Sequence, residues 1–500
     1  MTDKTTHDLD QLRRAAKDLA RGYARGEAEA RRRAATIASQ GDEFAPKHAD
    51  FLHVVARETG FSSWPALKDA VEHLGMDKAR AQQRLRVAIF SGQEAVMARL
   101  IETWPDLASG ALDLSLALYD TDAVREGLWN DPAAATRRLG MRSPLLHLAF
   151  SRYNMLRPDL QRASAEIAQM LVERGADVND CWVQPGSGEH PLSALYGAIG
   201  HANNMPLAEY LLRAGANPND NESLYHSTEL GHHEGLLMLL SHGAVPDGTN
   251  ALFRAMDFDD AKAVSMLLEA GATPDFGETS ALHHAARRGC GAEVVSALLE
   301  AGARTDRLVD GMSVGVMARL YAADAVASVV PAGSVPPSLK PVFAALEGEA
   351  GQPINAEILP KEALSLVHNI LDDPARLDEI KRLVAAGMPW DTPDGSGVTQ
   401  VQLAGWLGRA STMAFFLRMK PDLGHINGFG GTLLSTIIHG SEHAPKKDGR
   451  DHLACLEMAL KEGVALPRPA IDLAGRDDVK AFLQDWAKRY PGQVVSHGIT

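Results

Sequence analysis

Cysteine is scarce in this sequence. Its three cysteines, Cys181, Cys290 and Cys455, lie in different segments, and none belongs to a Cys-x-x-Cys pair. Three isolated cysteines cannot build a disulfide framework, so that class of fold is excluded.

Long apolar runs and basic segments are missing as well. No stretch approaches the roughly 18 uninterrupted apolar residues of a membrane-spanning helix. The chain begins MTDKTTHDLDQLRRAAKD, which is charged where a signal peptide would be apolar. The net charge of −14 repels nucleic acid and anionic lipid. We therefore expect a cytoplasmic protein with neither a nucleic-acid nor a membrane partner.

A repeated unit fills the middle of the chain. Five times an apolar pair is followed, after two further residues, by Gly-Ala. The glycines are Gly175, Gly215, Gly243, Gly271 and Gly302, which are 40, 28, 28 and 31 residues apart. A period of about 20–50 residues is typical of stacked helix pairs, because one pair cannot bury its own apolar face. The pattern predicts an all-α helical solenoid of about 9–11 helix pairs, with a helical leader and a C-terminal helical cap.

The clarity of the repeat divides the chain into five segments. We predict a helical leader over residues 1–78, degenerate repeats over 80–136, clear repeats over 137–308, an irregular proline-containing break over 309–360, and degenerate repeats with a cap over 361–490. The break is predicted from PAGSVPPSLKP, residues 331–341, which is too rich in proline to be helical throughout. We expect residues 470–490 to form the final helix pair, which Trp486 closes.

The best-preserved unit is TSALHHAARRGCGAEVVSALLEAGARTD, residues 279–306. It resembles the ankyrin-repeat pattern T-P-L-H-x-A-A-x-x-G…V-V-x-L-L-L-x-x-G-A-D, with Ala281 in place of the usual proline. We expect His283 to bond to backbone in the preceding turn, and Gly302 to end the second helix in the left-handed conformation. In the leader, HADFLHVVARETGFSSWPALK resembles a helical segment that precedes such repeats in bacterial proteins. The chain thus resembles a bacterial ankyrin-repeat domain-containing protein.

Counting within the repeats reveals two further features. About 18 residues before the terminal glycine, four successive repeats carry a ring, at Tyr196, Tyr225, Phe253 and His283. We expect these rings to stack as a ladder in the core. In two other units the same count is 28 residues. About ten extra residues thus lie near 151–164 and near 440–452, and such insertions map to loops that often bind partners.

The resemblance implies that a partner binds on the concave side, which the turn tips and the first helices form. The residues just before the turn glycine of a repeat, or at the corresponding place in a repeat, are then the binding candidates. They are Arg152, Tyr153, His201, Glu229, Leu230, Asp257, Phe258, Arg287, Arg288, Trp406 and His439. The set contains aromatic and arginine side chains, which are enriched at interaction hot spots. We therefore predict a protein or peptide partner, anchored on Phe258, Arg287 and Trp406.

Two alternatives to a binding scaffold stay open. The sequence has no phosphate-binding loop and no dinucleotide-binding motif, so we predict no cofactor. An enzyme or enzyme accessory could still bind a small molecule in the curved interior and use His201, His439, Glu442 and His443 as acid–base groups. His439, His443 and His452 could also hold a metal. Against this, their spacing is not His-Glu-x-x-His, and we expect Gly440 and Pro445 to interrupt a helix there.

Overall fold

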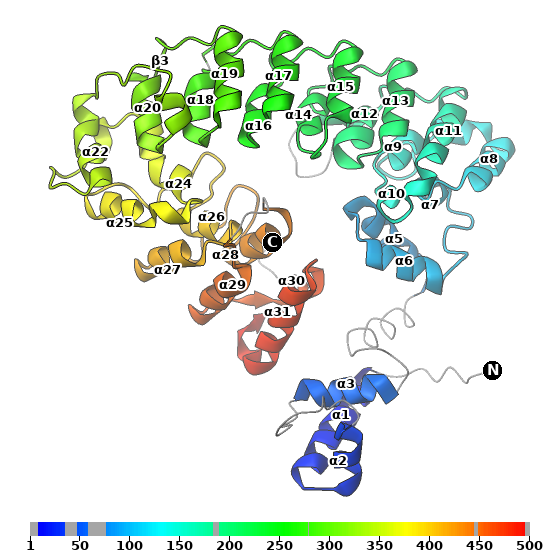
Figure 1. The fold of residues 1–500 in the computed structure, drawn as a ribbon. Coiled ribbons are helices and arrows are strands. Elements are labelled where there is room, and N and C mark those ends of the chain that lie inside the picture. Colours follow the sequence, from blue (N-terminus) through cyan, green and yellow to red (C-terminus); the bar gives the residue numbers. More distant parts are fainter. Residues whose placement is uncertain are drawn as a thin grey trace. The chain divides into compact units, whose positions relative to one another are not determined.

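The computed structural model describes residues 9–35, 48–58, 77–183, 190–278, 280–444 and 449–495 (Figure 1). It contains 61% helix and 4% strand, and it confirms the predicted all-α solenoid. No described helix is both long and apolar enough to cross a membrane. The chain divides into two compact units, Met1–Asp220 and Asn221–Thr500.

The leader has an apolar core of its own. Its described helices are α1 (Leu9–Ala24), α2 (Ala28–Ala35) and α3 (His48–Glu58). Leu12, Ala16 and Leu19 of α1 recur at helical spacing, and they belong to one buried cluster with Phe51 and Val55 of α3. The second half of the leader motif, GFSSWPALK, lies outside the described residues.

The rest of the first unit is built from short helices and one hairpin. The helices are α5 (Lys78–Ser91), α6 (Glu94–Thr103), α7 (Leu112–Ala117), α8 (Thr121–Asn130), α9 (Pro144–Ala149), α10 (Tyr153–Leu156), α11 (Gln161–Val172), α12 (Ala194–Tyr196) and α13 (Met205–Arg213). Strands β1 (Cys181–Val183) and β2 (Pro191–Ser193) pair antiparallel, with Trp182 opposite Leu192. A π-helical turn, Gly197–His201, continues α12. Helices α5, α7 and α9 pack in that order, so they form one layer.

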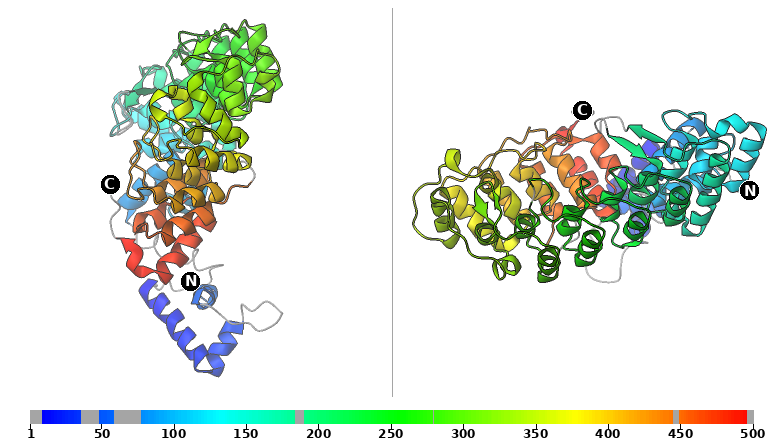
Figure 2. Two further views of the ribbon diagram at one scale, coloured as in Figure 1. Left: turned by 90° about the vertical axis from the view of Figure 1, so that its left-hand side faces the viewer. Right: turned by 90° about the horizontal axis from the view of Figure 1, so that it is seen from above.

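The second unit continues the pattern of helix pairs. Its helices are α14 (Ser223–Ser227), α15 (Glu234–Ser241), α16 (Ala251–Asp257), α17 (Ala261–Glu269), α18 (Ala281–Arg288), α19 (Ala292–Glu300), α20 (Val314–Tyr321), α21 (Asp324–Ala327), α22 (Lys340–Glu347), α23 (Lys361–Leu364), α24 (Leu366–Ile370), α25 (Leu377–Ala385), α26 (Gln400–Trp406), α27 (Ala410–Arg418), α28 (Leu433–His443), α29 (His452–Lys461), α30 (Arg468–Leu473) and α31 (Asp477–Arg489). Its strands are β3 (Leu308–Val309) antiparallel to β4 (Met312–Ser313), and β5 (Leu466–Pro467) parallel to β6 (Val494–Val495). The first helices α14, α16, α18 and α20 pack in order, and so do the second helices α17, α19 and α21 (Figure 1, Figure 2).

The five Gly-Ala pairs end their helices in the same way. The φ angles of the five glycines lie between 86° and 98°, in the left-handed region that favours glycine. The N–H of each following alanine donates to the carbonyl five residues back at 2.9–3.0 Å, for example from Ala303 to Leu298. This is the bonding of a Schellman motif, which satisfies carbonyls at the end of a helix. The predicted conformation of Gly302 is confirmed.

Two predictions about the best-preserved repeat differ from the structure. His283 is buried, and its Nε2–H donates to the Met312 carbonyl of the following hairpin at 3.0 Å. Its Nδ1 accepts a hydrogen bond from the Ser280 hydroxyl in the preceding turn at 2.9 Å, so the local bond is made to a side chain and not to backbone. The ring of Phe253 contacts that of His284 at 5.0 Å instead of that of His283. The predicted ladder therefore does not continue from Phe253 to His283, because the backbone bond holds His283 towards the next repeat.

Residues 309–360 contain more helix than a break implies. Strand β4 leads into α20, whose first turn is capped by the Ser313 hydroxyl, and α21 and α22 follow. The prolines stand between helices or, as Pro337 and Pro341, in the first turn of one. Proline is tolerated there because the first N–H groups of a helix lack intrahelical partners. At the end of the chain, the expected final pair is present as α30 and α31, and Trp486 is buried.

Helix α28 runs through Gly440, which we expected to interrupt it. A Cβ at this position would lie 2.1 Å from the carbonyl oxygen of Trp406 in α26. The glycine therefore permits a close approach of two helices instead of ending one. Pro445 lies outside the described residues.

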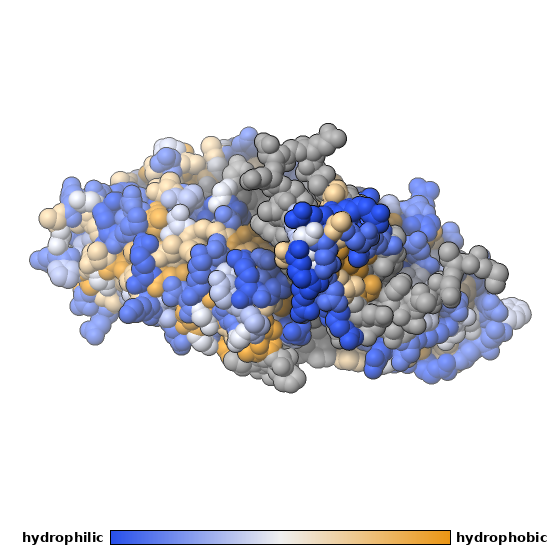
Figure 3. All heavy atoms as spheres, turned by 90° about the horizontal axis from the view of Figure 1, so that it is seen from below, coloured by the Kyte–Doolittle hydropathy of each residue, from blue (hydrophilic) through white to orange (hydrophobic). Residues whose placement is uncertain are grey.

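On the face shown in Figure 3, the described residues present hydrophilic and hydrophobic side chains that lie among one another. Single exposed apolar side chains are normal on protein surfaces, so only their neighbours can distinguish a binding residue.

The close approach at Gly440 predicts that Gly440→Ala destabilises the protein. The methyl group would meet backbone, which cannot rotate away, and we expect a loss of about 1–3 kcal/mol. Urea unfolding followed by circular dichroism measures the loss. Gly492→Ala is the matched control, because its Cβ would meet no atom within 4 Å, and we expect it to change stability by less than about 0.5 kcal/mol. Equal unfolding midpoints for the two variants would contradict the prediction.

Candidate functional site

Six of the predicted binding residues occupy equivalent positions in three consecutive repeats of the second unit. Each pair follows or ends a first helix. The pairs are Glu229 and Leu230 after α14, Asp257 and Phe258 at the end of α16, and Arg287 and Arg288 at the end of α18. Because α14, α16 and α18 pack side by side, the same register brings these positions into one row.

One arginine joins the first two repeats of the row. Arg254, in α16, places Nη2 2.6 Å from Glu229 and Nη1 3.3 Å from Asp257. Its guanidinium carbon also lies 4.8 Å from the centre of the Phe258 ring. Burial alone would raise the pKa of Glu229, but hydrogen bonds from His226 and Arg254 lower it below its ordinary value. The carboxylate is therefore ionised at pH 7.

The row continues through Asp257 into the third repeat. The Asp257 carboxylate accepts a hydrogen bond from His284 Nε2 at 2.9 Å and another from Arg288 Nε at 2.6 Å. Arg287 donates to His284 Nδ1 at 3.0 Å and pairs with Glu362 at 3.1 Å. Burial lowers the pKa of His284, which fits a neutral ring that donates from Nε2 and accepts at Nδ1. We call these connected residues the turn row: Glu229, Arg254, Asp257, His284, Arg287, Arg288 and Glu362.

The turn row differs in exposure along its length. The Asp257 and Glu362 side chains are largely covered, whereas the Arg288 side chain is 49% exposed. Phe258, which Arg254 covers on one side, is 44% exposed. Of the three anchors predicted from the sequence, Phe258 is therefore the open one in this row, while Arg287 is tied to Glu362 and His284.

The predicted C-terminal candidates lie around the contact between α26 and α28. Trp406 is half-buried, and its carbonyl accepts a hydrogen bond from His452 Nε2 at 3.0 Å. The rings of His439 and His443 lie 4.3 Å apart, and Glu442 accepts a hydrogen bond from the Gly475 N–H. Within the described ranges, no three His, Cys, Asp or Glu side chains are placed to hold a metal. His452 therefore does not join His439 and His443 as a ligand set, because its ring is bonded to the backbone of α26.

The three candidates in the first unit are largely covered. Arg152 Nε donates to the His201 carbonyl at 2.7 Å, and Tyr153 is buried with its ring 6.0 Å from that of Tyr119. His201 Nε2–H donates to the Phe90 carbonyl at 3.0 Å, and its ring lies 4.5 Å from that of Phe90. Burial lowers the pKa of His201 to about 3, so the ring is neutral at pH 7. Its hydrogen bond and burial assign it a structural role in place of the acid–base role in the enzyme alternative.

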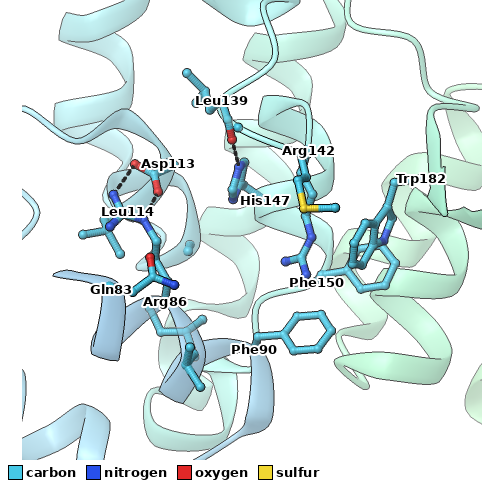
Figure 4. Close-up of a pocket in the computed structure, with 15 residues that line it drawn as sticks. Gln83, Arg86, Phe90, Asp113, Leu114, Leu139, Arg142, His147, Phe150 and Trp182 are labelled. Carbon is cyan, nitrogen blue, oxygen red and sulfur yellow. Dashed lines mark hydrogen bonds and ion pairs between the residues drawn. The ribbon is translucent and has the colours of Figure 1, made fainter. Parts of the chain in front are cut away.

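A cleft of about 710 Å³ opens beside these residues in the first unit (Figure 4). Helices α5, α7 and α9, the turn at residues 139–142 and strand β1 all contribute to its wall. Phe90, Phe150 and Trp182 form an aromatic side, and the Arg142 guanidinium lies against them. The guanidinium carbon is 4.3 Å from the Phe90 ring centre, 5.5 Å from that of Phe150 and 4.2 Å from that of Trp182. These distances are typical of cation–π contacts.

Sequence reasoning missed this cleft because its residues come from four separate segments of the chain. One signal was available. Phe90 stands two residues before Gly92, which has a positive φ of 70°, and that is the register from which the other binding candidates were chosen. Phe90 belongs to the degenerate repeats at 80–136, whereas the predicted binding residues all come from later repeats.

The burial of His201 predicts a pH dependence of stability. Its folded pKa of about 3 lies below the unfolded value of about 6.5, so the unfolded state binds the proton first as the pH falls. The stabilisation of the folded state by the neutral His201 ring is present above pH 6.5 and is lost progressively towards pH 3. We expect this group alone to lower the free energy of unfolding by up to about 2 kcal/mol between pH 7 and pH 5.

Urea unfolding at pH 7 and pH 5 tests this dependence. His201→Gln should lose less stability than the wild type between these two pH values, whereas His242→Gln, at an exposed histidine, should match the wild type. If His201→Gln loses as much unfolding free energy between pH 7 and pH 5 as the wild type does, His201 is not the source of the pH dependence.

Comparisons with known proteins place one segment in a family. Residues 278–309, which include α18 and α19, match the family described as Ankyrin repeat. No curated protein matches the chain. Among solved structures, the chain is similar to the human ASB11 ankyrin repeat domain, with 21% identity, a TM-score of 0.35, and coverage of 45% of this chain and 99% of that one. The segment at 278–309 is thus similar to an ankyrin repeat, and it forms one of the stacked helix pairs of the second unit.

Proposed function

We propose that the chain is a scaffold that binds a protein or peptide through the turn row and Phe258. The observation that carries this proposal is the connection of equivalent turn residues from three consecutive repeats by ion pairs, with Phe258 exposed among them. Stacked repeats present such positions along an extended surface, which suits a partner larger than a small molecule.

The ion pairs support binding by holding the surface in place. Arg254 is fixed by Glu229 and Asp257, and its guanidinium in turn lies against the Phe258 ring. A side chain that is already ordered loses less conformational entropy when a partner binds. Phe258 is then an exposed apolar side chain surrounded by polar residues, which is the usual composition of an interaction hot spot.

The proposal also keeps the finer features predicted from the sequence. We propose a cytoplasmic location, a bacterial origin and the five-segment division of the chain. The two expanded segments are proposed as additional contacts. One holds α10 and the start of α11, and the other begins at the end of α28.

Phe258→Asp tests the proposed surface. A charge at this position removes the apolar anchor. We expect the captured amount of at least one wild-type partner to fall by about tenfold or more. The measurement is affinity capture from the native cell with quantitative mass spectrometry, after circular dichroism has shown that the variant is folded.

Leu237→Asp is the matched control, because Leu237 is an exposed apolar residue on the second helix α15 and away from the turn row. It should capture the same proteins as the wild type. If both variants retain every wild-type partner in equal amounts, the turn row is not the binding surface.

A further inference from the structure

The cleft of the first unit carries one uncompensated positive charge. Arg86 forms a two-point ion pair with Asp113, at 2.5 and 3.1 Å, so those charges cancel. His147 donates from Nε2 to the Leu139 carbonyl at 2.8 Å, and burial lowers its pKa, so its ring is neutral at pH 7. Arg142 is the remaining ionisable group among the described lining residues. The cleft is thus positive in a chain whose net charge is −14.

Arg142 has donors to offer. Its guanidinium makes no hydrogen bond or ion pair with the part of the chain that the structure describes. Aromatic rings contact its faces, and such contacts leave the N–H groups along its edge unused. Burial lowers the pKa of Arg142 to about 10, which still leaves the group charged at pH 7. A charged group that is partly desolvated gains most from a partner of opposite charge.

A second donor in the same wall lacks an acceptor. Trp182 is 7% exposed, and its Nε1 is buried without a hydrogen-bond partner among the described residues. Leaving a buried N–H without an acceptor is unfavourable, and native structures seldom do so. Arg142 and Trp182 both line the aromatic side of the cleft, and the described protein supplies an acceptor to neither of their donor groups; Arg142 is the charged one of the two.

The size and lining of the cleft indicate the size and polarity of the ligand away from its charged group. Its volume of about 710 Å³ lies within the range of roughly 300–1,000 Å³ that is usual for small-molecule sites. Away from Arg142, the wall includes Val87, Leu114 and Met141, together with the aromatic rings. This surface suits an apolar or aromatic body. A single uncompensated charge suits a monoanion better than a doubly charged phosphate.

We propose that this cleft binds a monocarboxylate with an apolar or aromatic body, and that the carboxylate pairs with the Arg142 guanidinium. A planar carboxylate matches the fork of guanidinium N–H groups and accepts two parallel hydrogen bonds. The body of the ligand then lies along the apolar wall. The same chemistry occurs in a free organic acid and at the carboxyl terminus of a peptide that ends in an apolar residue. This site lies in the first unit, so it stands or falls independently of the turn row.

Calorimetric titration of the full chain with paired probes tests the proposal. The probes are 3-phenylpropanoate and octanoate, each against its neutral amide. We expect at least one acid to bind with a dissociation constant of about 1 mM or lower, and its amide to bind about tenfold more weakly or worse. Equal binding of acid and amide, or no binding of either acid, would overturn the proposal without any variant.

Variants then locate the site. Arg142→Gln should weaken binding of the acid about tenfold or more, and Arg142→Lys should retain part of the affinity because it keeps the charge. Arg125→Gln is the matched control, because Arg125 is an exposed arginine of the same unit that pairs with Asp122 outside the cleft. Wild-type affinity in Arg142→Gln, with circular dichroism unchanged, would overturn the assignment to Arg142.

The source of the carboxylate is tested by a third pair of probes. A tripeptide that ends in phenylalanine is titrated with a free and with an amidated carboxyl terminus. Tighter binding of the free-terminus peptide than of 3-phenylpropanoate assigns the cleft to a chain end. The reverse order assigns it to a small organic acid.

Discussion

The left-handed glycine at the end of each second helix is the constraint on which the clear repeats depend. An l-amino acid with a Cβ adopts this conformation at a cost of about 1–2 kcal/mol, so glycine is strongly favoured there. The alanine that follows donates its N–H to the carbonyl of a leucine five residues back, as Ala303 does to Leu298. That leucine is also a buried core residue. One short motif therefore ends the helix, satisfies its carbonyls and includes a leucine that packs in the core.

A constant helix end gives successive repeats the same register, and the register gives the second unit its polar surface. The turns of α16 and α18 lie at equivalent positions, so Asp257 can accept hydrogen bonds from His284 and Arg288 of the next repeat. Asp257 and Arg288 could be chosen from the sequence because they stand just before a turn glycine or at the equivalent position, whereas His284 was not among the predicted binding residues. Their pairing could not be predicted, because which atom meets which depends on rotamers. Arg254, which joins Glu229 to Asp257, lies outside the register and was not predicted.

Local rules failed where a contact between repeats decided the outcome. Gly440 looks like a helix breaker, but it lies inside α28. Glycine is needed there because the Trp406 backbone leaves no room for a Cβ. His283 belongs to a motif that suggests a local bond, but besides the local bond to Ser280 its ring also bonds to Met312 of the following hairpin. A repeat pattern defines the position of a residue within its own unit. It carries less information about the neighbouring unit, and least where the repeats are degenerate, as around the cleft.

The cleft illustrates why departures from a repeat are informative. In the turn row, each charged side chain has a partner of opposite charge or a hydrogen bond, as expected for groups that are partly removed from water. Arg142 is an exception, since it is partly buried against three aromatic rings and pairs with no described acceptor. Helix stacking alone does not require a cation at that position, and an apolar side chain would fill the space at a lower desolvation cost. Sequences tend to break local rules of stability where function requires it. The unpaired charge therefore favours a role for Arg142 in binding over a role in holding the repeats together.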